Sequence, residues 1–179
     1  MIVCSILLDV RSAGPGLPRR LADLKPFRQR RDLRVEVILA DDTEDPRLRR
    51  LANQHDARIV TTEGTPLGDH LNTAVAHCQG QALLFSAGEH AISADSLVRA
   101  LADIEQHSQD AVVLTTSSSG RLVQLWQRLR HQTPAGTLCI SRAWFERIGG
   151  CDPALDADAL PDLIERLRAC QARISDIGA

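Results

Sequence analysis

Short apolar runs alternate along this chain with segments whose apolar residues recur at helical spacing. The runs predict strands at residues 2–10, 35–40, 57–61, 82–85, 111–115, 137–141 and 172–177. Apolar residues three and four positions apart predict helices at residues 17–27, from 46 onward, and at 69–77, 93–106, 122–129, 142–148 and around 163–167. Strands that are apolar on both faces and separated by helices favour an α/β domain with a mostly parallel central sheet.

Two adjacent acids follow the predicted strand at residues 35–40. Asp41 and Asp42 come directly after this strand, which in a parallel α/β sheet places them at the edge where ligands bind. Carboxylates at that edge can accept hydrogen bonds from a ribose or a base, or help to hold a cation. Asp45 is better placed than Asp42 to cap the helix that begins at Pro46. The sequence therefore predicts a ligand site at Asp41 and Asp42.

The composition narrows the classes of function. The chain has 179 residues, a net charge of -2 and a pI near 6.3, which fits one domain of ordinary size and does not suggest nucleic-acid binding. No apolar run approaches the roughly 20 residues of a membrane span, so we expect no integral membrane segment. The five cysteines show no C-x-x-C spacing, and the first residues do not resemble a signal peptide. Both observations favour reduced thiols and a cytoplasmic protein.

Basic residues gather in and after the first predicted helix. They are Arg19, Arg20, Lys25, Arg28, Arg30 and Arg31. Such a cluster is usually a solvated helix face, and binding of phosphate or of a partner is the other interpretation.

Five motifs, taken in order, resemble the glycosyltransferase-A fold and in particular the family-2-like glycosyltransferases. They are V-E-V-I-L-A-D-D at residues 35–42, L-N at 71–72, G-Q-A-L-L-F at 80–85, I-S-R-A-W-F-E-R-I-G-G-C-D at 140–152 and D-L-I-E-R-L at 162–167. The resemblance covers residues 2 to about 175. It implies a single glycosyltransferase-like domain over residues 1–179, built as an α/β three-layer sandwich of the nucleotide-diphospho-sugar transferase type.

The resemblance also implies roles for the acids near the ends of the first two strands. Asp42 would bind the uracil or ribose of a nucleotide-sugar donor, and Asp41 belongs to the same nucleotide site. Asp9 lies where the family contacts the base, although a simple exposed acid at a strand end is an equally good interpretation. Asn72 in the family more often braces a neighbouring loop than takes part in catalysis.

The metal motif of the family is altered in this chain. Family members carry an Asp-x-Asp motif whose acids hold a divalent cation against the donor diphosphate. The corresponding residues here are Ala87, Gly88 and Glu89, followed by His90. Glu89 and His90 could hold a cation, with Mn²⁺ tolerated better than Mg²⁺ because of the nitrogen ligand. An ordinary polar loop is the other interpretation.

The base motif is altered as well. The family uses a late acidic pair to deprotonate the acceptor hydroxyl, and that pair falls here on Ala159 and Leu160. Asp156 and Asp158 lie close by, and Asp158 is the candidate catalytic base. Both acids are also typical of the first turn of a helix, where they interact favourably with its dipole.

These features leave two functions open. The first is a compact glycosyltransferase that uses a nucleotide-sugar donor, an unknown acceptor and a divalent cation, Mn²⁺ or Mg²⁺. The second is a catalytically degenerate glycosyltransferase fold, a pseudoenzyme that serves as a nucleotide-binding or partner-binding module. The short region at residues 111–138, where the family builds its acceptor pocket, predicts a shallow acceptor site or one that a protein partner completes.

Overall fold

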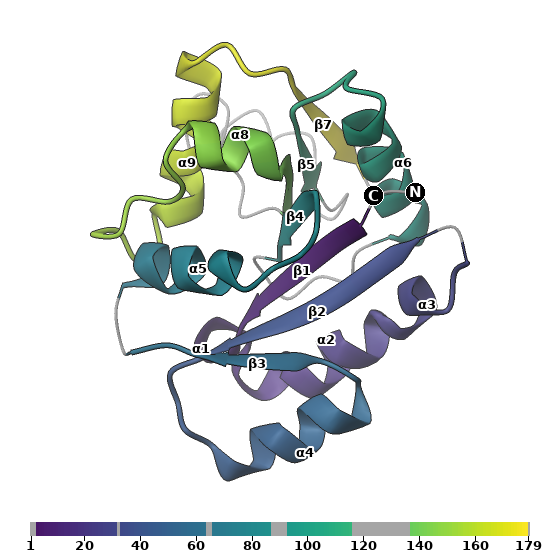
Figure 1. The fold of residues 1–179 in the computed structure, drawn as a ribbon, viewed down its shortest axis with the longest axis vertical. Helices are drawn as coiled ribbons and strands as arrows, with labels where there is room; N and C mark the ends of the chain where they lie inside the picture. The colour runs from purple at the N-terminus through teal and green to yellow at the C-terminus, as the bar shows by residue number, and fades with distance from the viewer. Residues whose placement is uncertain (1–2, 32, 64–65, 87–92, 116–136, 179) are drawn as a thin grey trace, which may run out of the picture.

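The computed structural model describes residues 3–31, 33–63, 66–86, 93–115 and 137–178 (Figure 1). Its strands are β1 (Val3–Asp9), β2 (Arg34–Asp41), β3 (Arg58–Thr61), β4 (Ala82–Phe85), β5 (Ala111–Thr115), β6 (Thr137–Ser141) and β7 (Ile174–Gly178). Its helices are α1 (Val10–Ala13), the 3₁₀ helix η1 (Gly14–Gly16), α2 (Leu17–Asp23), α3 (Lys25–Arg28), α4 (Pro46–Gln54), α5 (Leu67–Ala76), α6 (Ala94–Glu105), α8 (Arg142–Arg147) and α9 (Ala159–Ala169). The helix expected at residues 122–129 lies outside the described residues.

The described strands form one sheet in the order β3-β2-β1-β4-β6-β5-β7. β1 pairs in parallel with β2 and β4, β2 pairs in parallel with β3, and β5 pairs in parallel with β7. β6 runs antiparallel to both of its neighbours, β4 and β5. The prediction of an α/β domain with a mostly parallel central sheet is therefore confirmed.

Helices cover both faces of this sheet, which makes three layers (Figure 1). On one face α2, α3, α4 and α6 pack against the sheet through residues such as Leu21, Leu48 and Leu101. On the other face α5, α8 and α9 pack through residues such as Leu71 and Leu163. The two cores explain why the strands are apolar on both faces. Among the helices of the described residues, none has the length and apolar character needed to cross a membrane.

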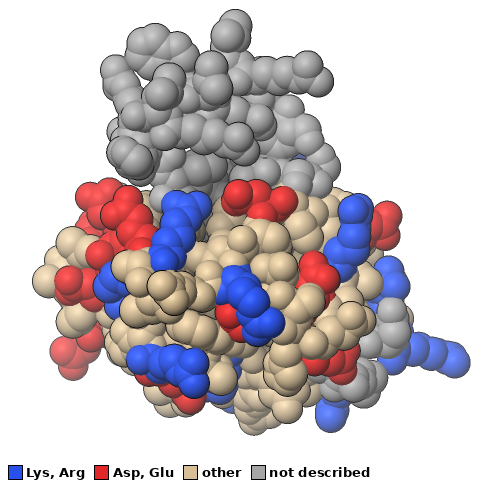
Figure 2. Space-filling model, turned by 90° about the horizontal axis from the view of Figure 1, so that it is seen from above, with Lys and Arg blue, Asp and Glu red and all other residues tan. Residues whose placement is uncertain are grey.

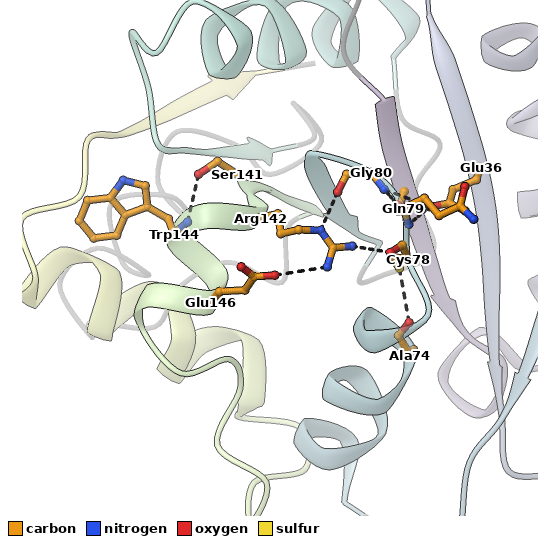
Figure 3. A network of polar contacts seen from close by, with 10 residues as sticks. Glu36, Ala74, Cys78, Gln79, Gly80, Ser141, Arg142, Trp144 and Glu146 are labelled. Carbon is orange, nitrogen blue, oxygen red and sulfur yellow. Dashed lines mark hydrogen bonds and ion pairs between the residues drawn. The ribbon is translucent and has the colours of Figure 1, made fainter.

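Arg142 ties α8 to the turn before β4 (Figure 3). Its Nε donates to the carbonyl oxygen of Gly80 at 2.8 Å, and its Nη2 donates to that of Cys78 at 2.8 Å. The same turn is held from the other side, where the Gly80 N–H donates to Ser5 Oγ at 2.8 Å. These bonds satisfy carbonyl groups that follow the end of α5, and they anchor the amino end of β4 beside β1.

Asp110 and Arg173 join the amino ends of β5 and β7. The Asp110 carboxylate accepts hydrogen bonds from Nε and Nη2 of Arg173 at 3.1 and 2.9 Å, and from its backbone N–H at 2.8 Å. The hydrogen bonds from Arg173 hold the pKa of Asp110 below its usual range, although burial acts in the opposite direction.

We expect Asp110→Asn to lower the free energy of unfolding by about 1–2 kcal/mol at neutral pH, because charge-assisted hydrogen bonds are lost. The folded pKa of Asp110 is the lower one, so its ionised form stabilises the fold above the unfolded pKa of about 3.9. This contribution disappears as the pH falls through the folded pKa. Urea denaturation of both proteins between about pH 7 and pH 3 should show the difference shrinking below about pH 4, and a constant difference would contradict the role of the pair.

Candidate functional site

The ends of three parallel strands meet at one edge of the sheet. Asp9, the last residue of β1, pairs in register with Ala40 near the end of β2, and Leu7 pairs with Phe85 at the end of β4. The chain builds outward from β1 to β3 and then returns to place β4 on the other side of β1. In open α/β sheets, ligands bind outside the carboxyl ends of the strands at such a reversal. The structure therefore brings Asp9 and the Asp41-Asp42 pair to the expected edge.

Asp41 is engaged in shaping the turn after β2. It is buried, and its Oδ1 accepts hydrogen bonds from the backbone N–H and the hydroxyl of Thr43 at 2.9 and 2.6 Å. Its carbonyl oxygen accepts from the N–H of Thr62 at 2.8 Å, which fixes the end of β2 against the end of β3. Asp45 caps α4 by accepting from the Arg47 N–H at 2.8 Å. The turn after β2 is thus shaped by Asp41 and α4 is capped by Asp45, so neither of these roles needs Asp42.

Asp9 is a buried residue held by two neighbours, and it is not the exposed strand-end acid of the alternative interpretation. Its Oδ2 accepts from the N–H of Ser12 at 2.8 Å and caps α1. Its Oδ1 lies 3.0 Å from Nδ1 of His70, a fully buried side chain on α5, although neither ring nitrogen makes a well-aligned hydrogen bond within the described part of the chain. Burial by itself raises the pKa of Asp9, but the contacts with His70 and Ser12 outweigh it and lower that pKa below its usual value.

Arg11 joins two acids at this edge. It lies on α1, and its Nη1 is 3.3 Å from Oδ2 of Asp42 while its Nη2 is 3.3 Å from Oδ1 of Asp156. The Asp42 side chain is 8% exposed, and its Oδ1 is buried with no hydrogen-bond partner among the described residues. Asp156 also accepts from the backbone N–H of Leu67 at the start of α5, at 3.2 Å.

The sequence interpretation missed Arg11 and His70. Arg11 follows Asp9 by two residues and could have been found as a charged residue next to a strand end. His70 shows no local signal, because it meets Asp9 only through the packing of α5 on the sheet.

Asn72 and Arg166 brace the loop that precedes α9. The side-chain amide of Asn72 donates to the carbonyl oxygen of Cys151 at 2.8 Å and accepts from its N–H at 2.9 Å. Arg166 is held by Asp162 at 2.7 Å and donates to the carbonyl oxygens of Ile148 and Gly150. The family motifs L-N and D-L-I-E-R-L are therefore structural in this chain, as expected for Asn72.

Asp158 is exposed at the N-cap position of α9, and its side chain makes no capping hydrogen bond. Ala159, where the acidic pair of the family would begin, is fully buried in the core. Glu89 and His90 lie outside the described residues, so the metal site remains a prediction. Within the described ranges, no group of three or more His, Cys, Asp or Glu residues is arranged to hold a metal ion.

A cleft of about 680 Å³ lies at the opposite edge of the sheet, near the amino ends of β1 and β2. Its rim includes Lys25 and Arg28 from the basic cluster, but Arg28 is already bound to the Asp56 carboxylate and to the carbonyl oxygen of His55. Glu36 adds a negative charge to the same rim. Acidic and basic side chains are also interspersed over the part of the face in Figure 2 that is not drawn in grey. The mixed charge of the cleft does not favour a phosphate ligand there.

Solved structures with the same fold include glycosyltransferases of distant sequence. A mannosyltransferase from Pyrobaculum calidifontis, solved with GDP-Man and Mn²⁺, has a TM-score of 0.73 at 20% identity, over 98% of this chain and 54% of its own. Glucosyl-3-phosphoglycerate synthase from Mycobacterium tuberculosis, solved with Mn²⁺, UDP and phosphoglyceric acid, has a TM-score of 0.71 at 15% identity, over 99% of this chain and 68% of its own. Mannosyl-3-phosphoglycerate synthase from Rubrobacter xylanophilus has a TM-score of 0.70 at 14% identity, over 99% and 66%.

These likenesses establish the GT-A fold, and the chain spans about half the length of the first of these proteins. A search of curated proteins gives no match. The family model of glycosyl transferase family 2 matches residues 5–155, which include Asp9, Asp41 and Asp42 and end before Asp158. The chain therefore belongs to glycosyl transferase family 2.

Proposed function

We propose that this chain is the donor-binding and catalytic domain of a glycosyltransferase, which transfers a sugar from a nucleotide-sugar donor to an acceptor. The observation that carries the proposal is Asp42, a mostly buried acid at the carboxyl edge of the sheet, one of whose oxygens has no hydrogen-bond partner in the described part of the chain. A buried acceptor without a partner is costly, and an N–H or O–H group of a ligand would satisfy it. Membership of the family supports sugar transfer as the reaction.

In this proposal the acids at the strand ends recognise the nucleoside. Asp42 accepts a hydrogen bond from a ring N–H of the base or from a ribose hydroxyl. Asp9 lies at the adjacent strand end, fixed by His70 and Ser12, and faces the base. Asp41 keeps the turn that carries Asp42 in shape through its hydrogen bonds with Thr43.

Asp158 is the proposed general base. Its carboxylate takes the proton of an acceptor hydroxyl while that oxygen attacks the anomeric carbon, and the bond from this carbon to the diphosphate oxygen breaks with inversion. Two observations support this role. Asp158 is exposed at the start of α9, and Asp156 in the same loop is within reach of the Arg11 side chain that contacts Asp42.

A divalent cation, Mn²⁺ or Mg²⁺, is proposed as the cofactor, with Glu89 and His90 as its ligands. A bound cation would neutralise charge on the leaving diphosphate. β4, the strand that leads toward Glu89, ends beside β1 at the edge where Asp9 lies.

The second candidate function is a degenerate domain that binds a nucleotide or a protein partner without catalysis. A specific observation favours it, because the position where the family begins its acidic pair is occupied here by the buried Ala159. The chain also has Ala87 where the family has the first acid of its metal motif. In either case the five unpaired cysteines support a reducing compartment such as the cytoplasm.

Calorimetric titration with UDP, GDP and CDP, each with and without Mn²⁺, tests the nucleotide site. A panel of UDP-, GDP- and CDP-sugars, followed by the release of nucleoside diphosphate, tests the reaction. We expect one nucleotide to bind and its sugar conjugate to be turned over in the presence of a cation. Turnover that is abolished by Glu89→Ala would exclude the degenerate domain, whereas binding without turnover would favour it. A folded protein that binds none of these nucleotides would contradict the proposal.

A further inference from the structure

Arg11 holds the acid that the proposed function assigns to the nucleoside. Its guanidinium contacts Oδ2 of Asp42, while the other oxygen of this carboxylate is buried and has no partner among the described residues. Because Oδ1 is buried and Oδ2 is paired with Arg11, we expect a nucleoside to bind this carboxylate when the guanidinium moves away from it.

The Arg11 side chain is able to move. It is 43% exposed and lies in a helix of four residues at the end of β1. Its second partner, Asp156, is 72% exposed, and each of the two contacts measures 3.3 Å. The pair with Asp156 is exposed on both sides and contributes little to stability, so it exchanges readily for a better partner. The pair with Asp42 joins the exposed guanidinium to a mostly buried carboxylate.

A diphosphate is a better partner for this guanidinium than the two carboxylates. The planar fork of arginine matches phosphate oxygens with two parallel hydrogen bonds. A nucleotide-sugar that places its nucleoside on Asp42 displaces Arg11 from that acid at the moment when a diphosphate arrives at the same edge of the sheet.

We propose that Arg11 is the residue that selects diphosphate-linked ligands, and that it passes from Asp42 and Asp156 to the diphosphate when the donor binds. This inference rests on the proposed function, because it assumes a nucleotide at Asp42. Arg11 would then determine specificity, because its side chain competes with a neutral nucleoside for Asp42 and binds the diphosphate of a charged nucleotide. In the free protein Asp156 pairs with the guanidinium and helps to keep it beside Asp42.

The test compares a nucleoside with its own diphosphate. Calorimetry gives the Kd values of uridine and UDP, guanosine and GDP, and cytidine and CDP for wild type, and the pair that binds is then measured with Arg11→Met. This substitution keeps an apolar stem and removes the charge. We expect the Kd of the diphosphate to rise about 10-fold or more, while the Kd of the neutral nucleoside stays constant or falls. Arg50→Met, an exposed residue of α4, is the matched control and should leave both Kd values unchanged.

A second variant keeps the test decisive if Arg11→Met fails to fold. Asp156→Asn retains an oxygen acceptor for the Leu67 N–H but removes the charge that holds Arg11. We expect it to tighten the diphosphate by about 2- to 5-fold without tightening the nucleoside. An unchanged ratio of the two Kd values in the folded variants would overturn the role of Arg11 and leave the proposed function standing. A wild-type protein that binds neither ligand of any pair would overturn both.

Discussion

Asp42→Asn is expected to raise the Kd of the nucleoside diphosphate that binds this domain by about 10- to 100-fold. The substitution keeps the size of the side chain but removes the negative charge. A hydrogen bond to a charged group is worth roughly 1.5–3 kcal/mol, and about 1.4 kcal/mol corresponds to a factor of ten in Kd. Calorimetric titration of wild type and variant with the same nucleotide measures the change directly.

The fold should tolerate this substitution. Among the described residues Asp42 makes one ion pair, with the half-exposed Arg11, so the free energy of unfolding should change by less than about 1 kcal/mol. Asp45→Asn is the matched control, because it removes an acid from the same turn and asparagine remains a good cap for α4. A variant of Asp42 that binds the nucleotide as tightly as wild type would show that the nucleoside lies elsewhere.

Local patterns were sufficient for most strands of the fold. β4, β5 and β6 begin and end where the apolar runs predict, because each run is buried on both faces. The direction of β6 and its place between β4 and β5 were not predictable, since strand pairing depends on contacts between distant segments. Residues 10–16 form the short helices α1 and η1, and Asp9 caps α1 through the N–H of Ser12.

The candidate site was predictable only in part, and for the same reason. Asp41 and Asp42 are marked by their position at the end of an apolar run. The partners of Asp42 and Asp9 are not, because Arg11 meets an acid 145 residues away at Asp156 and His70 approaches Asp9 from a different helix. The sequence could likewise not show that Asp41 is bound within its own turn, whereas one oxygen of Asp42 has no partner among the residues that the structure describes.

Gly68 fixes the distance between α5 and the loop that precedes α9. Its N–H donates to the carbonyl oxygen of Leu155 at 2.9 Å. A Cβ atom at this position would lie 1.9 Å from the carbonyl oxygen of Asp152 and 3.2 Å from that of Leu155. Both obstacles are backbone atoms, so a side chain can be accommodated only if the helix and the loop move apart.

Gly68→Ala is therefore expected to lower the free energy of unfolding by about 3 kcal/mol, at the upper end of the usual cost of overpacking. For a domain of this size that corresponds to a fall in Tm of roughly 6–12 °C. The same displacement moves His70 away from Asp9 and the Leu67 N–H away from Asp156, so nucleotide affinity should fall together with stability.

Gly16→Ala is the control, because its φ is -77° and a Cβ there meets no atom within 4 Å. This variant should be neutral or more stable by about 0.4–1 kcal/mol, since alanine reduces the entropy of the unfolded chain. Thermal denaturation of wild type and both variants measures these changes. A Tm of Gly68→Ala equal to that of wild type would mean that Gly68 does not fix the distance between α5 and the loop.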